Sequence, residues 1–184
     1  MSSSILVTYA TRYSSTQEVA DAIAKTLRDR GLIAEALPVH TVTSIVPYDA
    51  VVLGAPIYYD KWHKDALRFL SQHCVALITR PVAVFALGPL RPEEAEMKAA
   101  RSALDKALAG YSWLSPVATE VFLGKYDPAN LRFPDSLLLK LPASPFRKVA
   151  ASDLRDWPGI RAWAEGLVGK LQGDESVTDK KQES

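Results

Sequence analysis

Residues 5–20 read ILVTYATRYSSTQEVA, and this stretch decides the fold. Ile5 to Val7 is a short apolar run, typical of a strand that is covered on both faces of a parallel sheet. Hydroxyl side chains follow directly, and Ser15 with Glu18 three residues later fits a helix capping box. The stretch therefore predicts a buried strand that turns straight into a helix.

The turn between this strand and helix predicts a phosphate site. Helix N-terminal N–H groups have no partner within the helix and carry the positive end of its dipole, so with hydroxyl donors they bind a phosphate. The candidate ligand residues are Thr11, Ser14, Ser15 and Thr16, with Arg12 and Tyr13 between them. A capped helix without a ligand is the alternative, because Ser and Thr are common at helix starts.

Composition predicts one globular domain. The 184 residues are 48% hydrophobic with a net charge of +1, which provides a full core and excludes a basic nucleic-acid binder. The single cysteine, Cys74, excludes an internal disulfide, and its spacing from Leu67 and Leu70 predicts a core thiol on a helix face. No stretch approaches the roughly 18 to 20 apolar residues of a membrane span, so we expect a cytoplasmic protein. His40 and His73 lack the spacing of metal ligands, and we expect no metal site.

Strands and helices alternate along the rest of the chain. The further predicted strands are Ile33–Leu37, Ala50–Gly54, Pro81–Leu87 and Val117–Leu123, and the further helices begin near Lys64, Pro92 and Pro158. This alternation predicts an α/β fold with a doubly wound parallel sheet, whose ligands bind at the carboxyl ends of the strands. We expect one domain over residues 1–171 and a flexible polar tail over 172–184.

An insert interrupts the pattern between the fifth strand and the last helix. It covers residues 126–150, much longer than the usual connection of about 2 to 6 residues in such domains. Leu137 to Leu139 and Leu141 lie beside Lys140 and Arg147 in it. Three interpretations remain open: a helix packed on the domain, a peripheral contact with a lipid surface, and a cover over an apolar ligand.

The type of phosphate site follows from motifs that the chain lacks. It has no G-x-x-x-x-G-K-[ST] and no G-x-G-x-x-G, which argues against a P-loop triphosphatase and a dinucleotide site. An acidic receiver pocket would need aspartates where the chain has Thr8 to Thr11 and Gly54 to Ile57. The hydroxyl-rich turn instead suits the terminal phosphate of a mononucleotide.

The turn TRYSST at residues 11–16 resembles the FMN-phosphate loop of flavodoxins, usually [ST]-x-[ST]-G-x-T, with Tyr13 at a Ser/Thr position and Ser14 at the glycine position. GAPIYYDKWH (54–63) and FALGPL (85–90) resemble the two flavin-flanking loops of flavodoxin-domain proteins of the menaquinone-dependent protoporphyrinogen IX dehydrogenase family. The resemblance continues through GKYDPANLRF (124–133) and DLRDWPGIRAWA (153–164).

The resemblance implies a flavodoxin-like five-stranded sheet of order 2-1-3-4-5 and FMN as cofactor. It also implies an oxidoreductase that passes electrons from a reduced organic substrate, protoporphyrinogen IX, to a quinone. Two alternatives remain open, a one-electron carrier and a scaffold without flavin. Shuttle flavodoxins are typically strongly acidic to steer toward basic partners, so the near-neutral charge favours the enzyme.

A flavin ring needs flat stacking surfaces and backbone donors at its polar edge. The expected contacts are Pro56, Ile57, Tyr58, Tyr59 and Trp62 after the third strand, and Leu87, Gly88, Pro89 and Leu90 after the fourth. Because proline lacks an N–H, a donor to the flavin N5 comes from Gly88, Leu90 or the Tyr58 loop. Trp62 has the alternative of packing the next helix, and His63 is either a proton relay or an exposed histidine without a role.

Overall fold

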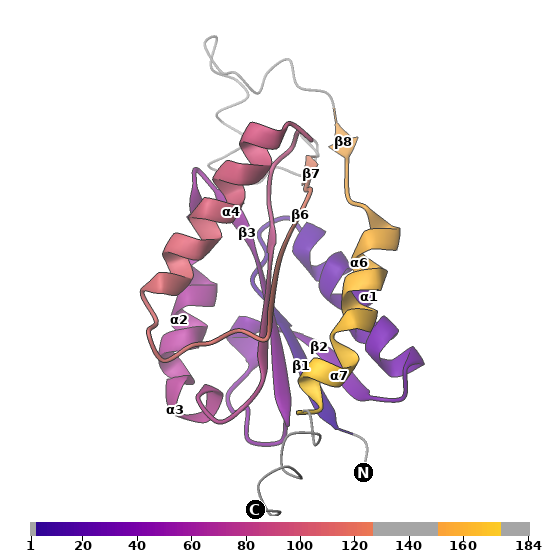
Figure 1. Ribbon diagram of the computed structural model, residues 1–184, viewed down its shortest axis with the longest axis vertical. Coiled ribbons are helices and arrows are strands. Elements are labelled where there is room, and N and C mark those ends of the chain that lie inside the picture. The colour runs from indigo at the N-terminus through magenta and orange to yellow at the C-terminus, as the bar shows by residue number, and fades with distance from the viewer. Residues whose placement is uncertain (1–2, 127–150, 174–184) are drawn as a thin grey trace, which may run out of the picture.

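The computed structural model describes residues 3–126 and 151–173, which form a sheet with helices on both faces (Figure 1). Its strands are β1 (Ser4–Tyr9), β2 (Ile33–Pro38), β3 (Ala50–Tyr58), β4 (Lys61–Trp62), β5 (Val82–Leu87), β6 (Ala118–Phe122), β7 (Lys125–Tyr126) and β8 (Ser152–Asp153). Its helices are α1 (Ser15–Asp29), the 3-10 turn η1 (Val39–Thr41), α2 (Lys64–Gln72), α3 (Cys74–Leu77), α4 (Glu94–Ala109), α6 (Trp157–Gly166) and α7 (Val168–Leu171).

The main sheet has the order β2-β1-β3-β5-β6, with every one of these pairs parallel. This is the predicted order 2-1-3-4-5, because the extra strand β4 has only two residues and pairs antiparallel with the end of β3. The predicted doubly wound sheet is therefore confirmed. The chain crosses from β2 to β3 over β1, so the order reverses between β1 and β3, where such folds bind ligands.

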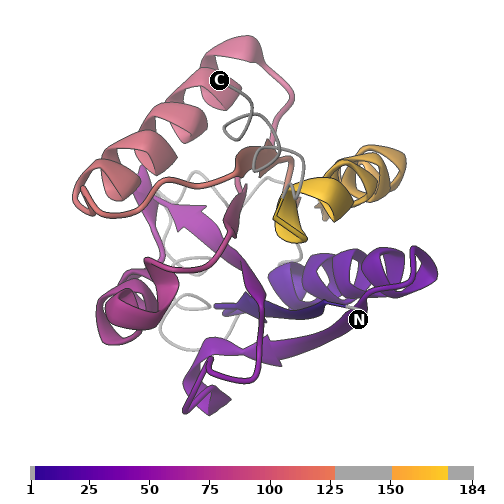
Figure 2. The ribbon, with the colours of Figure 1, turned by 60° about the horizontal axis from the view of Figure 1, so that its bottom comes forward.

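Alternating strand residues divide the core between the two faces of the sheet. Ile5 and Val7 pack with Ile23 of α1 and Ile160 of α6 on one face, and all four are fully buried. Leu6 points to the other face, where the buried residues of α2 and α4 gather. Figure 2 shows these two helix pairs on opposite sides of the sheet. Val19, Ile23 and Leu27 recur at helical spacing, so α1 covers the sheet with an apolar stripe, and α6 packs beside it on the same face.

Gly54, within β3, is the point where the end of β1 joins the neighbouring strand. Its carbonyl accepts a hydrogen bond from the Ala10 N–H at 2.9 Å. A side chain at this position would overlap the Phe85 ring, whose Cζ lies 1.9 Å from where a Cβ would be. Phe85 in turn packs against Phe122 and Trp163, with ring centroids 6.1 Å away in each case. The glycine is therefore required for close packing in this strand.

The ends of the predicted insert form a short hairpin, β7 with β8, in which Lys125 pairs with Asp153 and Tyr126 with Ser152. The sequence did not indicate this hairpin. Residues 127–150 of the predicted 126–150 insert lie outside the described residues, as do residues 174–184 of the predicted tail.

Two local predictions are wrong. The capping box is absent, because the N-cap of α1 is Ser14, which makes no side-chain capping bond, and Ser15 is already helical. Cys74 is half-buried and is not a core thiol. The helix ends at Gln72 and a new one begins at Cys74, so the shared face assumed from the spacing does not continue. None of the helices in the described part of the chain is both long and apolar enough to span a bilayer.

Candidate functional site

The carboxyl ends of β1, β3 and β5 meet at one edge of the sheet. The strand register sets Tyr9 beside Gly54, and Pro56 beside Leu87. The three predicted loops follow these strand ends, so the fold brings the predicted phosphate and ring contacts to one edge. The loops are called the phosphate loop (residues 10–16), the β3 loop (58–63) and the β5 loop (88–90).

The phosphate loop holds two buried hydroxyls without a partner. The Oγ1 atoms of Thr11 and Thr16 are buried and accept or donate no hydrogen bond in the described structure, and Thr16 is fully buried. Leaving a buried hydroxyl without a hydrogen bond costs about 1–3 kcal/mol of stability. Two such hydroxyls in one loop therefore indicate a ligand that accepts their hydrogen bonds. Both hydroxyls adjoin the N-terminus of α1, where N–H groups and the helix dipole favour an anion. The loop fits a phosphate.

Ser14 supplies the backbone turn that a glycine normally supplies. It has φ 64° and ψ −7°, the left-handed conformation, which costs a residue with a side chain about 1–2 kcal/mol. Replacement of the usual glycine by serine therefore leaves the turn intact and adds strain. Next to it, the Arg12 guanidinium lies 5.8 Å from the centre of the Tyr13 ring.

The β3 loop presents aromatic side chains at a tight turn. Tyr59 and Asp60 have positive φ, 50° and 57°, and the Tyr59 side chain is exposed. Ile57 and Tyr58 are half-buried, and the Tyr58 ring packs edge-on against His63 with centroids 6.2 Å apart. Tyr58 is therefore held by a neighbour while one part of it stays accessible to a flat ligand.

Trp62 faces the core. It is only 2% exposed, packs in the cluster that contains Ala66 and Phe69 of α2, and its Nε1 donates to the Ala55 carbonyl at 3.1 Å. This arrangement favours the alternative in which Trp62 packs the following helix. At the site, Trp62 holds the β3 loop against the core.

His63 is the N-cap of α2, and the interpretation as an exposed histidine is wrong. Its side chain is 17% exposed, and Nδ1 accepts a hydrogen bond from the Asp65 N–H at 3.3 Å. Burial lowers its pKa below the ordinary value of 6.5; Asp65 raises it, and the Lys64 and Arg12 cations lower it further. The neutral ring is the form that caps the helix.

The β5 loop is fixed by the end of β6. The Gly88 N–H donates to the Phe122 carbonyl at 2.9 Å, and the Gly124 N–H donates to the Pro89 carbonyl at 3.0 Å. Leu87 is buried. Since the Gly88 N–H is already used, the predicted backbone donors to a bound ring reduce to Leu90 and the β3 loop.

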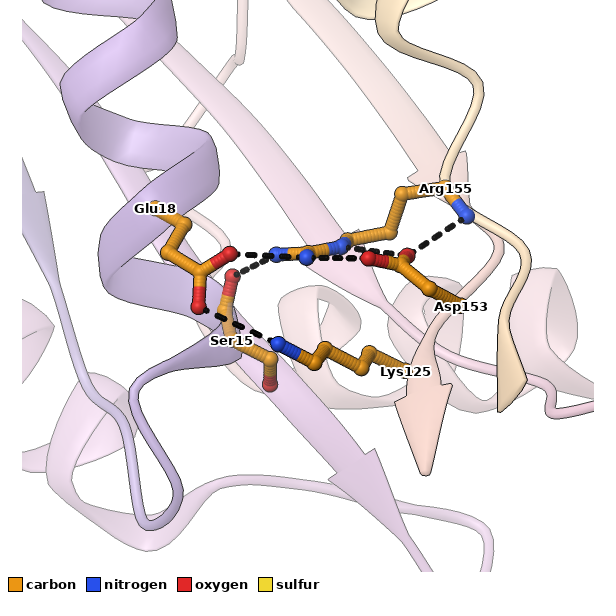
Figure 3. Close-up of polar contacts among 5 residues, drawn as sticks. All are labelled: Ser15, Glu18, Lys125, Asp153 and Arg155. Carbon is orange, nitrogen blue, oxygen red and sulfur yellow. Dashed lines mark hydrogen bonds and ion pairs between the residues drawn. The ribbon is translucent and has the colours of Figure 1, made fainter. Parts of the chain in front are cut away.

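Arg155, which the sequence did not single out, adjoins the phosphate loop (Figure 3). Its side chain is 2% exposed, and it contacts Glu18 at 2.7 Å, Asp153 at 2.6 Å and the Ser15 carbonyl at 3.1 Å. Lys125 lies 3.5 Å from the other oxygen of Glu18. In the sequence, Arg155 could have been noticed only as an arginine between two acids in DLRDW, and this pattern alone does not indicate a buried side chain. Within the described ranges, no cluster of three or more His, Cys, Asp or Glu residues is placed to hold a metal ion.

Comparison with known proteins agrees with this geometry. The family model described as a flavodoxin domain matches residues 6–147. A curated relative from Escherichia coli strain K12, protoporphyrinogen IX dehydrogenase [quinone], is 28% identical over 139 residues, covering 74% of this chain and 76% of the relative.

Solved flavodoxins share the fold at low sequence identity. A short-chain flavodoxin associated with a bacterial microcompartment has a TM-score of 0.58 at 18% identity, covering 91% of this chain and 98% of its own. A flavodoxin from the domain Archaea has a TM-score of 0.56 at 13% identity, covering 92% and 99%. These likenesses support the fold, and the family match implies FMN as the cofactor.

Proposed function

The chain belongs to the flavodoxin-domain family, and on this premise we propose that it is an FMN-dependent oxidoreductase that oxidises protoporphyrinogen IX and passes the electrons to a quinone. The observation that carries the cofactor side of this proposal is the pair of buried, unpaired hydroxyls of Thr11 and Thr16 at the start of α1. The named activity of the Escherichia coli relative supports the substrate and the acceptor.

The three loops have different tasks in this proposal. The phosphate loop binds the FMN phosphate through the hydroxyls of Thr11, Ser14, Ser15 and Thr16 and the N–H groups of the first turn of α1. Tyr58 and Tyr59 of the β3 loop, with Pro56 and Ile57, form one wall for the ring. Leu87, Pro89 and Leu90 form the other edge, and Leu90 or the β3 loop provides a backbone N–H.

Bound FMN supplies the two-electron redox chemistry. The residues of this chain position the ring and limit its contact with water, and His63 is neutral at pH 7 because burial lowers its pKa. Because Nδ1 accepts from the Asp65 N–H, the neutral His63 ring beside Tyr58 carries its hydrogen at Nε2 and donates from there. In the proposed relay the Nε2 proton passes outward while Nδ1 takes up a proton in place of the Asp65 hydrogen bond.

The test uses FMN-loaded protein under anaerobic conditions, with protoporphyrinogen IX and a soluble menaquinone analogue. Porphyrin fluorescence should rise only when protein and quinone are both present. A matched sample of the Thr11→Val/Thr16→Val variant serves as the control, because it lacks the proposed phosphate hydroxyls. Porphyrin formation at the rate of this control would contradict the proposal.

The second candidate function is an electron carrier without a substrate of its own. The fold supports it, but the net charge of +1 differs from the strong negative charge that steers carriers toward basic partners. Reduction of the bound flavin by a flavodoxin reductase, with one-electron acceptors reoxidising it faster than quinone does, would favour this function.

Peripheral membrane contact through residues 126–150 is a separate proposal, in a cytoplasmic protein. It rests on the leucines Leu137 to Leu139 beside Lys140, since buried apolar side chains and nearby cations together attach a protein to anionic lipid. Co-sedimentation with anionic vesicles tests it. Binding should fall with salt and disappear in the Leu138→Asp/Lys140→Glu variant, and protein that stays in the supernatant at low salt would contradict it.

A further inference from the structure

The first turn of α1 is connected to residues that follow the insert, far along the chain. Arg155 donates through Nη1 to the carbonyl of Ser15, the first helical residue, at 3.1 Å. The two residues are 140 positions apart, and the guanidinium that joins them is 2% exposed. Figure 3 shows Arg155 between the helix and the strand that carries Asp153.

Two carboxylates hold the guanidinium in place. Asp153 accepts from Nε at 2.8 Å and from Nη2 at 2.6 Å, a bidentate arrangement that fixes the plane of the group. Glu18, in the first turn of α1, forms two ion pairs: its Oε2 lies 2.7 Å from Arg155 Nη2, and its Oε1 lies 3.5 Å from Lys125 Nζ. The ring of Trp157 covers the guanidinium at 4.6 Å from its centroid. Two cations and two anions therefore balance, and the arginine is buried without an uncompensated charge.

The residue that Arg155 contacts lies between two key positions of the phosphate loop. Ser14 precedes it with a strained left-handed turn, and Thr16 follows it with the buried unpaired hydroxyl. A strained turn persists only when its surroundings fix it. A hydrogen bond to the Ser15 carbonyl restricts the Ser15–Thr16 peptide unit, and with it the positions of the Thr16 hydroxyl and of the first N–H groups of α1.

We propose that Arg155 is a positioning residue for the cofactor phosphate: through Ser15 it keeps the phosphate loop in its binding conformation, and the β7–β8 hairpin is the support from which it acts. This inference rests on the proposed binding of FMN. It assigns Arg155 no contact with the cofactor, and it requires a planar fork rather than a charge alone.

The other end of α1 provides a matched control. There Arg30 contacts Glu165 of α6 at 2.8 Å, so it also joins α1 to the C-terminal part of the chain. This pair is exposed, 54% and 45%, and lies at the helix end opposite the phosphate loop. Loss of an exposed pair has little effect on stability.

The experiment compares FMN with riboflavin, which has the same ring and no phosphate. Dissociation constants are measured by flavin fluorescence for wild type, Arg155→Met, Arg155→Lys and Arg30→Met. Arg155→Met should weaken FMN binding by about tenfold or more, the loss expected when a charge-assisted contact goes, and leave riboflavin binding unchanged. Arg155→Lys should recover little of the loss, and Arg30→Met should equal wild type for both ligands.

Four results separate the possibilities. An equal loss for FMN and riboflavin, or unchanged FMN binding in Arg155→Met, overturns the positioning role. Failure of wild type to bind either flavin contradicts the proposed function instead. If Arg155→Met does not fold, Arg155→Lys carries the same test, because it keeps the charge while losing the bidentate fork, and equal FMN affinity in that variant overturns the inference.

Discussion

The phosphate loop and the β3 loop lie at the same edge of the sheet, yet they are built in opposite ways. The phosphate loop buries the hydroxyls of Thr11 and Thr16, which no group in the described part of the chain satisfies. In the β3 loop the buried ring nitrogens have partners, because Trp62 Nε1 donates to the Ala55 carbonyl and His63 Nδ1 accepts from the Asp65 N–H, and Tyr59 is exposed to solvent. One loop has buried side-chain polar atoms for a ligand to complete, while the other has its buried side chains partnered and offers aromatic surface.

This difference assigns two separate contributions to cofactor binding. A loop with unsatisfied buried donors selects for a charged group of defined geometry, and it weakens the free protein. A loop with satisfied polar atoms and aromatic side chains binds the ring by contact area and hardly distinguishes phosphorylated from unphosphorylated flavin. Affinity for FMN over riboflavin should therefore come from the phosphate loop alone.

The largest expected effect is in the phosphate loop. Thr11→Val/Thr16→Val should weaken FMN binding by about 3 kcal/mol or more, because two charge-assisted hydrogen bonds are lost. The same variant should leave the stability of the free protein unchanged or raised, since valine replaces a buried unpaired hydroxyl. FMN titration and chemical denaturation of the free protein measure the two effects.

Thr26→Val is the matched control for this variant. Thr26 is also buried on α1, but its hydroxyl already donates to the Ala22 carbonyl at 2.9 Å. It should leave FMN binding at the wild-type value. Wild-type FMN affinity in the Thr11/Thr16 double variant would place the phosphate elsewhere.

Gly54→Ala tests the close packing of the strands that carry the two loops. A Cβ at this position overlaps the Phe85 ring, and overpacking of this kind costs about 1–3 kcal/mol of stability. Denaturant unfolding should show this loss, and Phe85→Leu in the same chain should recover part of it. Gly110→Ala, where the nearest atom is 3.5 Å from the added Cβ, is the control and should unfold like wild type. A neutral Gly54→Ala would contradict the close packing described for this strand.

Tyr58→Ala addresses the ring side of the comparison. Loss of an aromatic contact should weaken flavin binding by about 1 kcal/mol, and by the same amount for FMN and riboflavin. Parallel titrations with both flavins measure this. A loss confined to FMN would break the division between the loops, and no change in affinity or flavin spectrum would remove Tyr58 from the site.

The smallest expected effect is the pH response of His63. Its pKa is lowered in the folded protein, mainly by burial, so the unfolded chain binds the proton more readily. Stability should fall by up to about 1 kcal/mol as the pH drops through 6.5 and then through the lowered pKa, and level off below it. Denaturation curves measured from about pH 8 down to about pH 5 should show this component.

His63→Asn should remove that component, because asparagine keeps a capping oxygen and does not titrate. His73, whose pKa burial also lowers, contributes equally to both proteins and cancels in the comparison. An identical pH response in wild type and His63→Asn would show that the cap does not depend on the neutral ring.

Local sequence pattern determined the framework of this protein. Apolar runs such as Ile5 to Val7 and helical stripes such as Val19, Ile23 and Leu27 indicated the strands, the helices and the buried faces. Alternation of the two indicated a parallel sheet, and the resemblance to flavodoxins supplied its strand order. The hydroxyls of Thr11 and Thr16 were also recognisable, because a strand followed at once by a helix places its turn where anions bind.

Only the tertiary structure decided how the site residues are used. Ser14 adopts a glycine-like conformation, Trp62 turns inward and His63 caps a helix, and none of these orientations follows from residue type. Arg155 shows the reason most clearly. Its partner Ser15 is 140 positions away, and two segments so distant in sequence meet only after the sheet, α1 and α6 have packed. A contact between side chain and backbone at that separation leaves no periodic signal in the chain.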